Sequence, residues 1–220
     1  MPPDRVVVTL DRRFFPQQQK LVEDLARFIG RRGLLEFRVL PTTDRAELSA
    51  AEIKRYTEAL TEKGPGSASD NQYRWVEIRD IDEWHNPDSV VGQSGNKHYV
   101  LASNRPDETM LHEPDTGGWK LENAYPTTDD MGRSAIGFTL DQRGGDLFWS
   151  LTKDNGGRPL AILLDNVAIA APTINPGVPI RGQGIIMGMF TTSEVADMVT
   201  VLNSDPLPFD LHLTESVWED

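Results

Sequence analysis

The sequence predicts an α+β fold: a mostly antiparallel sheet with helices packed on one face and ferredoxin-like β-α-β elements. Short runs of β-branched and aliphatic residues are separated by glycine, proline, asparagine and aspartate, which is typical of many short strands. Few segments repeat apolar residues at helical spacing, and a turn pair such as Asp165-Asn166 joins two strands directly. Short strands joined by hairpins and accompanied by a few helices indicate this fold class.

The N-terminal residues 4–40 predict a β-α-β unit. Residues 5–10 form a β-branched run, and the segment that opens at Pro16 repeats apolar residues at helical spacing until Gly33 ends it. Residues 35–39 then alternate apolar and charged side chains, which is the pattern of a strand with one buried face.

The next stretch, residues 41–118, has weaker patterns. Ser49 and Glu52 have the spacing of a capping box, which predicts a helix that ends near Gly64. Two short apolar runs predict strands at 73–78 and 98–101. The loop between them carries a group of acidic side chains and one histidine: Asp80, Asp82, Glu83, His85 and Asp88.

The C-terminal half has the clearest patterns, and its elements are expected in the order β-α-β-β-β-α-β. Thr191 and Glu194 form a second capping box ahead of apolar residues spaced i, i+3, i+4 and i+7. The predicted elements are strands at 136–140, 160–164, 167–171, 185–189 and 209–214, and helices at 144–155 and 191–202.

The charge of the chain restricts its partners. A formal net charge of -12 and a pI near 4.8 argue against a nucleic-acid partner and against adsorption on anionic lipid, because both need a cationic surface. No cysteine is present, so disulfides and thiolate metal sites are excluded. The longest apolar run is too short for the roughly 20 residues that span a bilayer, and we expect the chain itself to be soluble.

No motif organises a reaction, so the sequence predicts no catalytic, cofactor-binding or metal-binding residue and a protein that is not an enzyme. The nucleophile elbow and the glycine-rich phosphate loops are missing. The four histidines are scattered without the spacing of a helical metal pair. The acidic loop at 80–88 could hold a cation, but it lacks the EF-hand pattern, and a solvated acidic loop is the favoured interpretation.

Three neighbouring side chains are candidates for peptide contact: Met187, Met189 and Phe190. Methionine and aromatic side chains adapt to varied apolar partners. The alternative is core packing, which we favour because Met187 and Met189 would share one face of the strand predicted at 185–189. The five tryptophans have the same two interpretations, peptide contact or core packing, and the exposure of their side chains decides between them.

Several runs, met in one order along the chain, resemble motifs of SecD, the protein-export membrane protein of the Sec translocase. The runs in the C-terminal half are NGGRPLAILLDN at 155–166, VAIAAPTI at 167–174, GMFTTSEVA at 188–196 and LNSDPLP at 202–208. Two more lie near the N-terminus, RVVVT at 5–9 and LEFR at 35–38. Asn166 stands where the family has a turn glycine, which is tolerable because asparagine also adopts positive φ.

The resemblance implies an extracytoplasmic domain with a base and a mobile head. By this analogy residues 4–40 and the returning strand at 207–218 belong to the base, and 41–205 form the head. Within the head, 41–118 is a divergent insertion and 119–205 is the family-like part. The prolines that flank the head are candidate hinge residues: Pro41, Pro206 and Pro208.

The resemblance also implies a function without catalysis. The domain would lie on the periplasmic side of the bacterial inner membrane, as part of a membrane protein, and bind the emerging preprotein while the membrane part uses the proton-motive force. SecF and the SecYEG channel would be partners through the full-length protein. The alternative hypothesis is a soluble structural or scaffolding protein that has a SecD-like fold and binds a folded partner.

Overall fold

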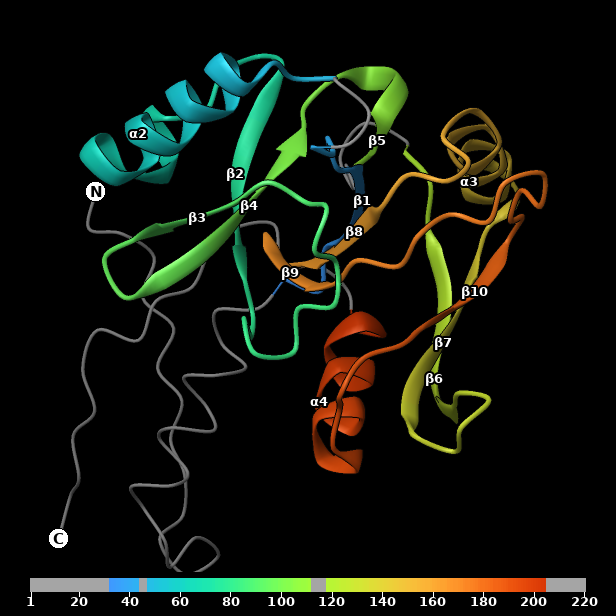
Figure 1. Cartoon of the computed structure of the whole chain (residues 1–220). Coiled ribbons are helices and arrows are strands. Elements are labelled where there is room, and N and C mark those ends of the chain that lie inside the picture. The colour runs from blue at the N-terminus through green and yellow to red at the C-terminus, as the bar shows by residue number, and fades with distance from the viewer. Residues whose placement is uncertain (1–31, 44–46, 112–117, 205–220) are drawn as a thin grey trace, which may run out of the picture. The chain divides into compact units, whose positions relative to one another are not determined.

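The computed structural model describes residues 32–43, 47–111 and 118–204 (Figure 1). From Gly33 onward these residues belong to one compact unit. They contain a seven-stranded sheet, a three-stranded sheet and the helices α2, α3 and α4, so the predicted α+β class is confirmed. The elements predicted at 5–29 and 209–214 lie outside the described residues.

The described strands are β1 (Leu35–Val39), β2 (Tyr73–Ile78), β3 (Val91–Ser94), β4 (Lys97–Ser103), β5 (Thr109–Met110), β6 (Leu121–Thr128), β7 (Ser134–Leu140), β8 (Leu160–Leu164), β9 (Val167–Ala170) and β10 (Gln183–Ile186). The helices are α2 (Ala50–Ser67), α3 (Gln142–Asp154) and α4 (Thr192–Leu202), with the 3-10 turn η1 (Pro106–Glu108). Strands β1, β2 and β8 have the predicted bounds. β3, β5 and β6 were not predicted, and β10 ends three residues before the predicted 189.

The seven-stranded sheet has the order β3-β4-β2-β9-β8-β1-β5, and of its pairings only β2 with β9 is parallel. The sheet curls strongly. Arg38 of β1 donates from Nη1 to the carbonyl oxygen of Ser103 in β4 at 3.0 Å, although three strands separate β1 from β4. Small and branched side chains pack together on the inner face of the curl: Val76, Val100, Ala102, Ala161 and Leu163.

All three helices lie on the outer face of this sheet. Directly opposed residues point to the same side, and the register connects Leu35 with Leu164, then Leu164 with Val167, and Val167 with Glu77. The side of Leu35 packs against α3, α4 and the three-stranded sheet, and the side of Glu77 includes Trp75, which packs against α2. The prediction of helices on one face is therefore confirmed.

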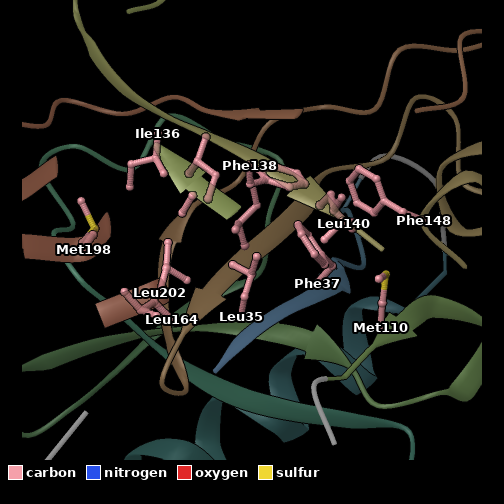
Figure 2. Packing of buried hydrophobic residues seen from close by; sticks show 14 of the residues in the cluster. Leu35, Phe37, Met110, Ile136, Phe138, Leu140, Phe148, Leu164, Met198 and Leu202 are labelled. Atoms are coloured by element: carbon pink, nitrogen blue, oxygen red, sulfur yellow. The ribbon is translucent and has the colours of Figure 1, made fainter. Parts of the chain in front are cut away.

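The main core lies between the seven-stranded sheet and the three-stranded sheet, whose order is β10-β7-β6 (Figure 2). Phe37 of β1 is at its centre, with ring centroids 5.8 Å from Phe138 of β7 and 4.6 Å from Phe148 of α3. Met198 and Leu202 of α4 close the other end. Each fully buried side chain of this size stabilises the fold by about 1.5–3 kcal/mol.

The helix ends follow the predicted capping chemistry. Ser49 begins α2 and Thr191 begins α4, each in a complete capping box with the glutamate three residues later. α2 continues to Ser67 through a kink at Gly64, where φ is 77°, so its predicted end marks the kink instead. Asn166 has a φ of 65°, which confirms its predicted place at the positive-φ turn position.

Candidate functional site

A groove of about 300 Å³ lies between three segments that are far apart in the sequence. One wall is β9 with the residues after it, 168–173, and a second wall is the loop that follows β2, residues 79–86. The third wall is formed by residues 187–189, on the connection from β10 to α4. Figure 1 shows this connection as an extended segment that leads from β10 to α4.

Two of the three candidate contact residues line this groove. Met187 is 47% exposed and Met189 is 49% exposed, so core packing is wrong for both of them. Phe190 is buried and belongs to the main core, as that alternative predicted. Both methionines continue the exposed face of Gln183 and Ile185, whereas Ile186 and Phe190 on the other face are buried.

Arg79 braces the groove from one side to the other. Its guanidinium contacts Glu83 in its own loop at 2.8 Å and Glu194 at the start of α4 at 2.6 Å. It also lies 4.9 Å from the ring centre of Phe190. The backbone N–H of Thr191, with help from Arg79, keeps the pKa of Glu194 below its usual range, so this carboxylate stays charged. The cation is thus balanced by two anions.

Two further polar side chains of the walls, Arg133 and Asn86, also contact neighbours. Arg133 pairs with Asp129 at 2.7 Å and directs Nη1 towards the sulfur of Met189 at 3.9 Å. Asn86 is buried and donates to the carbonyl oxygen of Ala171 at 3.4 Å, while its Oδ1 accepts no hydrogen bond. The groove therefore offers thioethers and neutralised charges, which suits an uncharged apolar segment better than an anion.

Two carboxylates of the acidic loop at 80–88 form interactions within the protein. Asp80 accepts a hydrogen bond from the backbone N–H of Asp82 at 3.0 Å, and Glu83 pairs with Arg79. Among residues 32–43, 47–111 and 118–204, no three His, Asp or Glu side chains gather in a way that could hold a metal ion.

The other predicted features fall in different places. Pro41 lies two residues after the end of β1 and is buried, while Pro206 and Pro208 lie outside the described residues, so the hinge stays a prediction. Of the tryptophans, Trp75 and Trp119 are buried and Trp84 lines the groove. In the part of the chain that is described, no helix is both long and apolar enough to cross a membrane.

Two groove residues were not singled out from the sequence. Arg79 lies 115 residues before its partner Glu194, so no local pattern connects them. Asn86 has no distinguishing neighbour in the sequence either. The capping box did identify Glu194, but only in its role at the start of the helix.

Comparisons with known proteins agree with the fold. Residues 97–209 match the family profile described as SecDF, P1 head subdomain. The match begins within the stretch 41–118 that we expected to be an insertion. A solved structure described as "Structure and function of a membrane component SecDF that enhances protein export" superposes with a TM-score of 0.52 at 23% identity, over 97% of this chain and 78% of that one.

Curated relatives agree with the profile. The protein translocase subunit SecD of Rhodobacter capsulatus is 36% identical over 131 residues, which is 59% of this chain and 23% of that protein. The SecD of Leptotrichia buccalis is 35% identical over 99 residues, 45% of this chain and 24% of that protein. The matches thus span about a quarter of these relatives' length. The family profile covers half of the chain, and the chain belongs to the SecDF family, with a P1 head subdomain.

Proposed function

We propose that this domain binds extended, unfolded segments of a preprotein in the groove beside Met187 and Met189. The observation that carries the proposal is the half-exposure of these two side chains next to an open groove. Unbranched thioether side chains adapt to apolar partners of different shapes. A domain that handles many preproteins needs this kind of surface, because no single sequence is its ligand.

The size and charge of the groove support a segment as the ligand. A volume of about 300 Å³ is at the lower end of ligand pockets, so it accommodates a few side chains. A stable complex with a folded partner buries more than about 1,000 Å² of surface, which needs a much larger contact area than this groove. The balanced charge of Arg79 also favours an uncharged segment over an anionic one.

The wider setting of the proposal comes from the family. The domain would act without catalysis on the periplasmic side of the membrane, in a translocase that draws on the proton-motive force. SecF and the SecYEG channel would contact the full-length protein. A base made of residues 4–40 and 207–218, and a hinge at Pro41, Pro206 and Pro208, would let the head move with its bound segment.

Binding of a permanently unfolded protein tests the proposal. Reduced, carboxymethylated α-lactalbumin should bind the chain, and native α-lactalbumin should not. The double variant Met187→Ser with Met189→Ser should bind about tenfold more weakly, equivalent to about 1.4 kcal/mol. Leu147→Ser is the matched control, because Leu147 is 44% exposed on α3 and does not line the groove.

Two results would contradict the proposal. Equal binding by the double variant and the parent chain would remove the groove as the site. Equal binding of native and unfolded α-lactalbumin would instead favour a scaffolding protein for folded partners.

A further inference from the structure

The three-stranded sheet has two edges, and one of them is closed by a side chain. At the β6 edge, the amide of Asn203 donates from Nδ2 to the carbonyl oxygen of Ala124 and accepts at Oδ1 from its backbone N–H, both at 2.8 Å. A side chain thus takes the place of the next strand. An exposed edge otherwise offers its backbone groups to any passing chain.

The opposite edge, β10, has no such cover among the described residues. Antiparallel residues alternate between pairs that exchange hydrogen bonds and pairs that do not. The N–H of Leu140 donates to the carbonyl oxygen of Gly182 at 2.7 Å, so Gly184 and Ile186 are the next residues bonded to β7. The backbone N–H and C=O groups of Gln183 and Ile185 therefore point away from β7, along the outer edge.

This open edge leads directly into the groove. Gln183 and Ile185 are exposed, with Ile185 at 47%, so solvent and a partner chain can reach them. The chain then continues through Met187 to Met189, which line the groove. The outward-facing backbone groups of β10 and the two methionines of the groove thus follow one another along a single segment of the surface.

We propose that an extended polypeptide adds to β10 as a fourth strand of this sheet. Its main chain would exchange hydrogen bonds with Gln183 and Ile185, and its side chains would lie against Met187 and Met189. This inference rests on the proposed function and specifies its chemistry. The occupant is an unfolded segment because the free partners are backbone groups, which every sequence supplies, so affinity does not depend on one motif.

A backbone methylation series tests this mode directly with the unmodified protein. The probe is a fluorescein-labelled decapeptide of alternating valine and serine with a lysine at each end, and binding is measured by anisotropy. In an added strand only every second N–H faces the sheet. N-methylation should therefore weaken binding at least tenfold at alternate positions and little at those between. Uniform small effects along the peptide would overturn strand addition.

A proline substitution tests the same edge from the protein side. Ile185→Pro removes an N–H that points away from β7 and leaves the bonds of Gly184 and Ile186 to β7 in place. It should weaken peptide binding at least tenfold, whereas Ile185→Ala, which keeps the N–H, should weaken it less than threefold. Circular dichroism checks folding, and if the proline variant does not fold, the methylation series decides.

The results separate this inference from the proposed function. If the unmodified chain does not bind carboxymethylated α-lactalbumin, the proposed function is contradicted. Binding of that protein without alternation in the peptide series would overturn strand addition alone. If β10 pairs with a second copy of the chain, sedimentation will show a dimer that Ile185→Pro abolishes and peptide does not displace, which would also overturn the inference.

Discussion

The guanidinium of Arg158 lies 2.5 Å from Oε1 of Glu108, and both side chains are at most 10% exposed. Arg158 precedes β8, whereas Glu108 ends the turn η1, so the pair ties two distant segments together. Arg158 also contacts Asn155 at 2.7 Å and Glu47 at 2.9 Å. Burial alone would raise the pKa of Glu108, but hydrogen bonds from Arg158 and its other neighbours outweigh it and lower that pKa.

Removing one partner of this pair should destabilise the fold strongly. Glu108→Leu leaves the buried charge of Arg158 without its closest anion, and we expect a loss of about 3–5 kcal/mol in the free energy of unfolding. Adding Arg158→Met should cost less than the two single changes together, because the buried cation is removed with its closest anion, although Glu47 and Arg105 each lose one partner. Urea unfolding measures all three variants.

The control for this cycle is an exposed ion pair on α2. Lys54 and Glu58 are 3.6 Å apart with exposed side chains of 74% and 60%, so Glu58→Ala should cost less than about 1 kcal/mol. A loss for Glu108→Leu no larger than that of Glu58→Ala would show that the buried pair does not stabilise this fold.

The same pair shows what the sequence could predict. Local chemistry was sufficient for both capping boxes and for the strand of residues 160–164, where a glycine, a proline or a turn pair marks each end. The partner of Arg158 was not predictable, since Glu108 lies 50 residues away. β6 was missed because the run LENAYPTT has no clear alternation and contains Pro126, which a strand accepts at a sheet edge.

The site was predictable only in part. The sequence identified the methionines at 187 and 189 as candidates that share one face of a strand, but it did not show which face is buried, and the burial that we favoured is wrong. The face that carries Ile185 and both methionines is exposed, whereas Ile186 and Phe190 on the other face pack in the main core, and this choice of face depends on packing between distant elements. The other groove walls are distant in the sequence. Arg79 lies more than 100 residues before Met187, and the start of β9 lies about 20 residues before it, so no local pattern brings these walls together.

Two glycines with a positive φ should respond differently to alanine. Gly33 has a φ of 68°, and an added Cβ would lie 2.4 Å from the carbonyl oxygen of Val201. Gly64 has a φ of 77°, with open space around the added atom. Gly64→Ala should cost about 1–3 kcal/mol from backbone strain alone, because a φ of 77° with a ψ of 170° is open essentially to glycine, and Gly33→Ala should cost more. Equal melting temperatures for the two variants would rule out a steric limit at Gly33.

Alkaline pH should weaken the packing of α2 through Tyr56. Burial, and then the 2.6 Å hydrogen bond to Asp70, raises the pKa of Tyr56 to about 12. An unfolded tyrosine has a pKa near 10. The raised pKa means that the protonated form stabilises the fold fully below about pH 10, and this contribution is lost as the pH rises towards 12.

Urea midpoints between pH 9 and 12 measure this effect. The parent chain should lose stability over the upper part of that range, and Tyr56→Phe should start lower and fall less steeply. Tyr73 also has a raised pKa, chiefly from burial, so Tyr73→Phe is a needed comparison. Identical slopes for the parent chain and Tyr56→Phe would place the alkaline loss elsewhere.

The closed edge of β6 should depend on one side chain. Asn203→Ala removes both hydrogen bonds to the buried Ala124, and each lost partner of a buried backbone group costs about 1–3 kcal/mol. Ser204→Ala is the matched control, since its exposed hydroxyl donates to the carbonyl oxygen of Thr200 within the same helix end and not to β6. We expect Asn203→Ala to unfold at lower urea and to associate at high concentration, because its β6 edge is then open. If Asn203→Ala matches Ser204→Ala in both measurements, Asn203 does not protect the β6 edge. The proposed difference between a covered β6 edge and an open β10 edge is then contradicted.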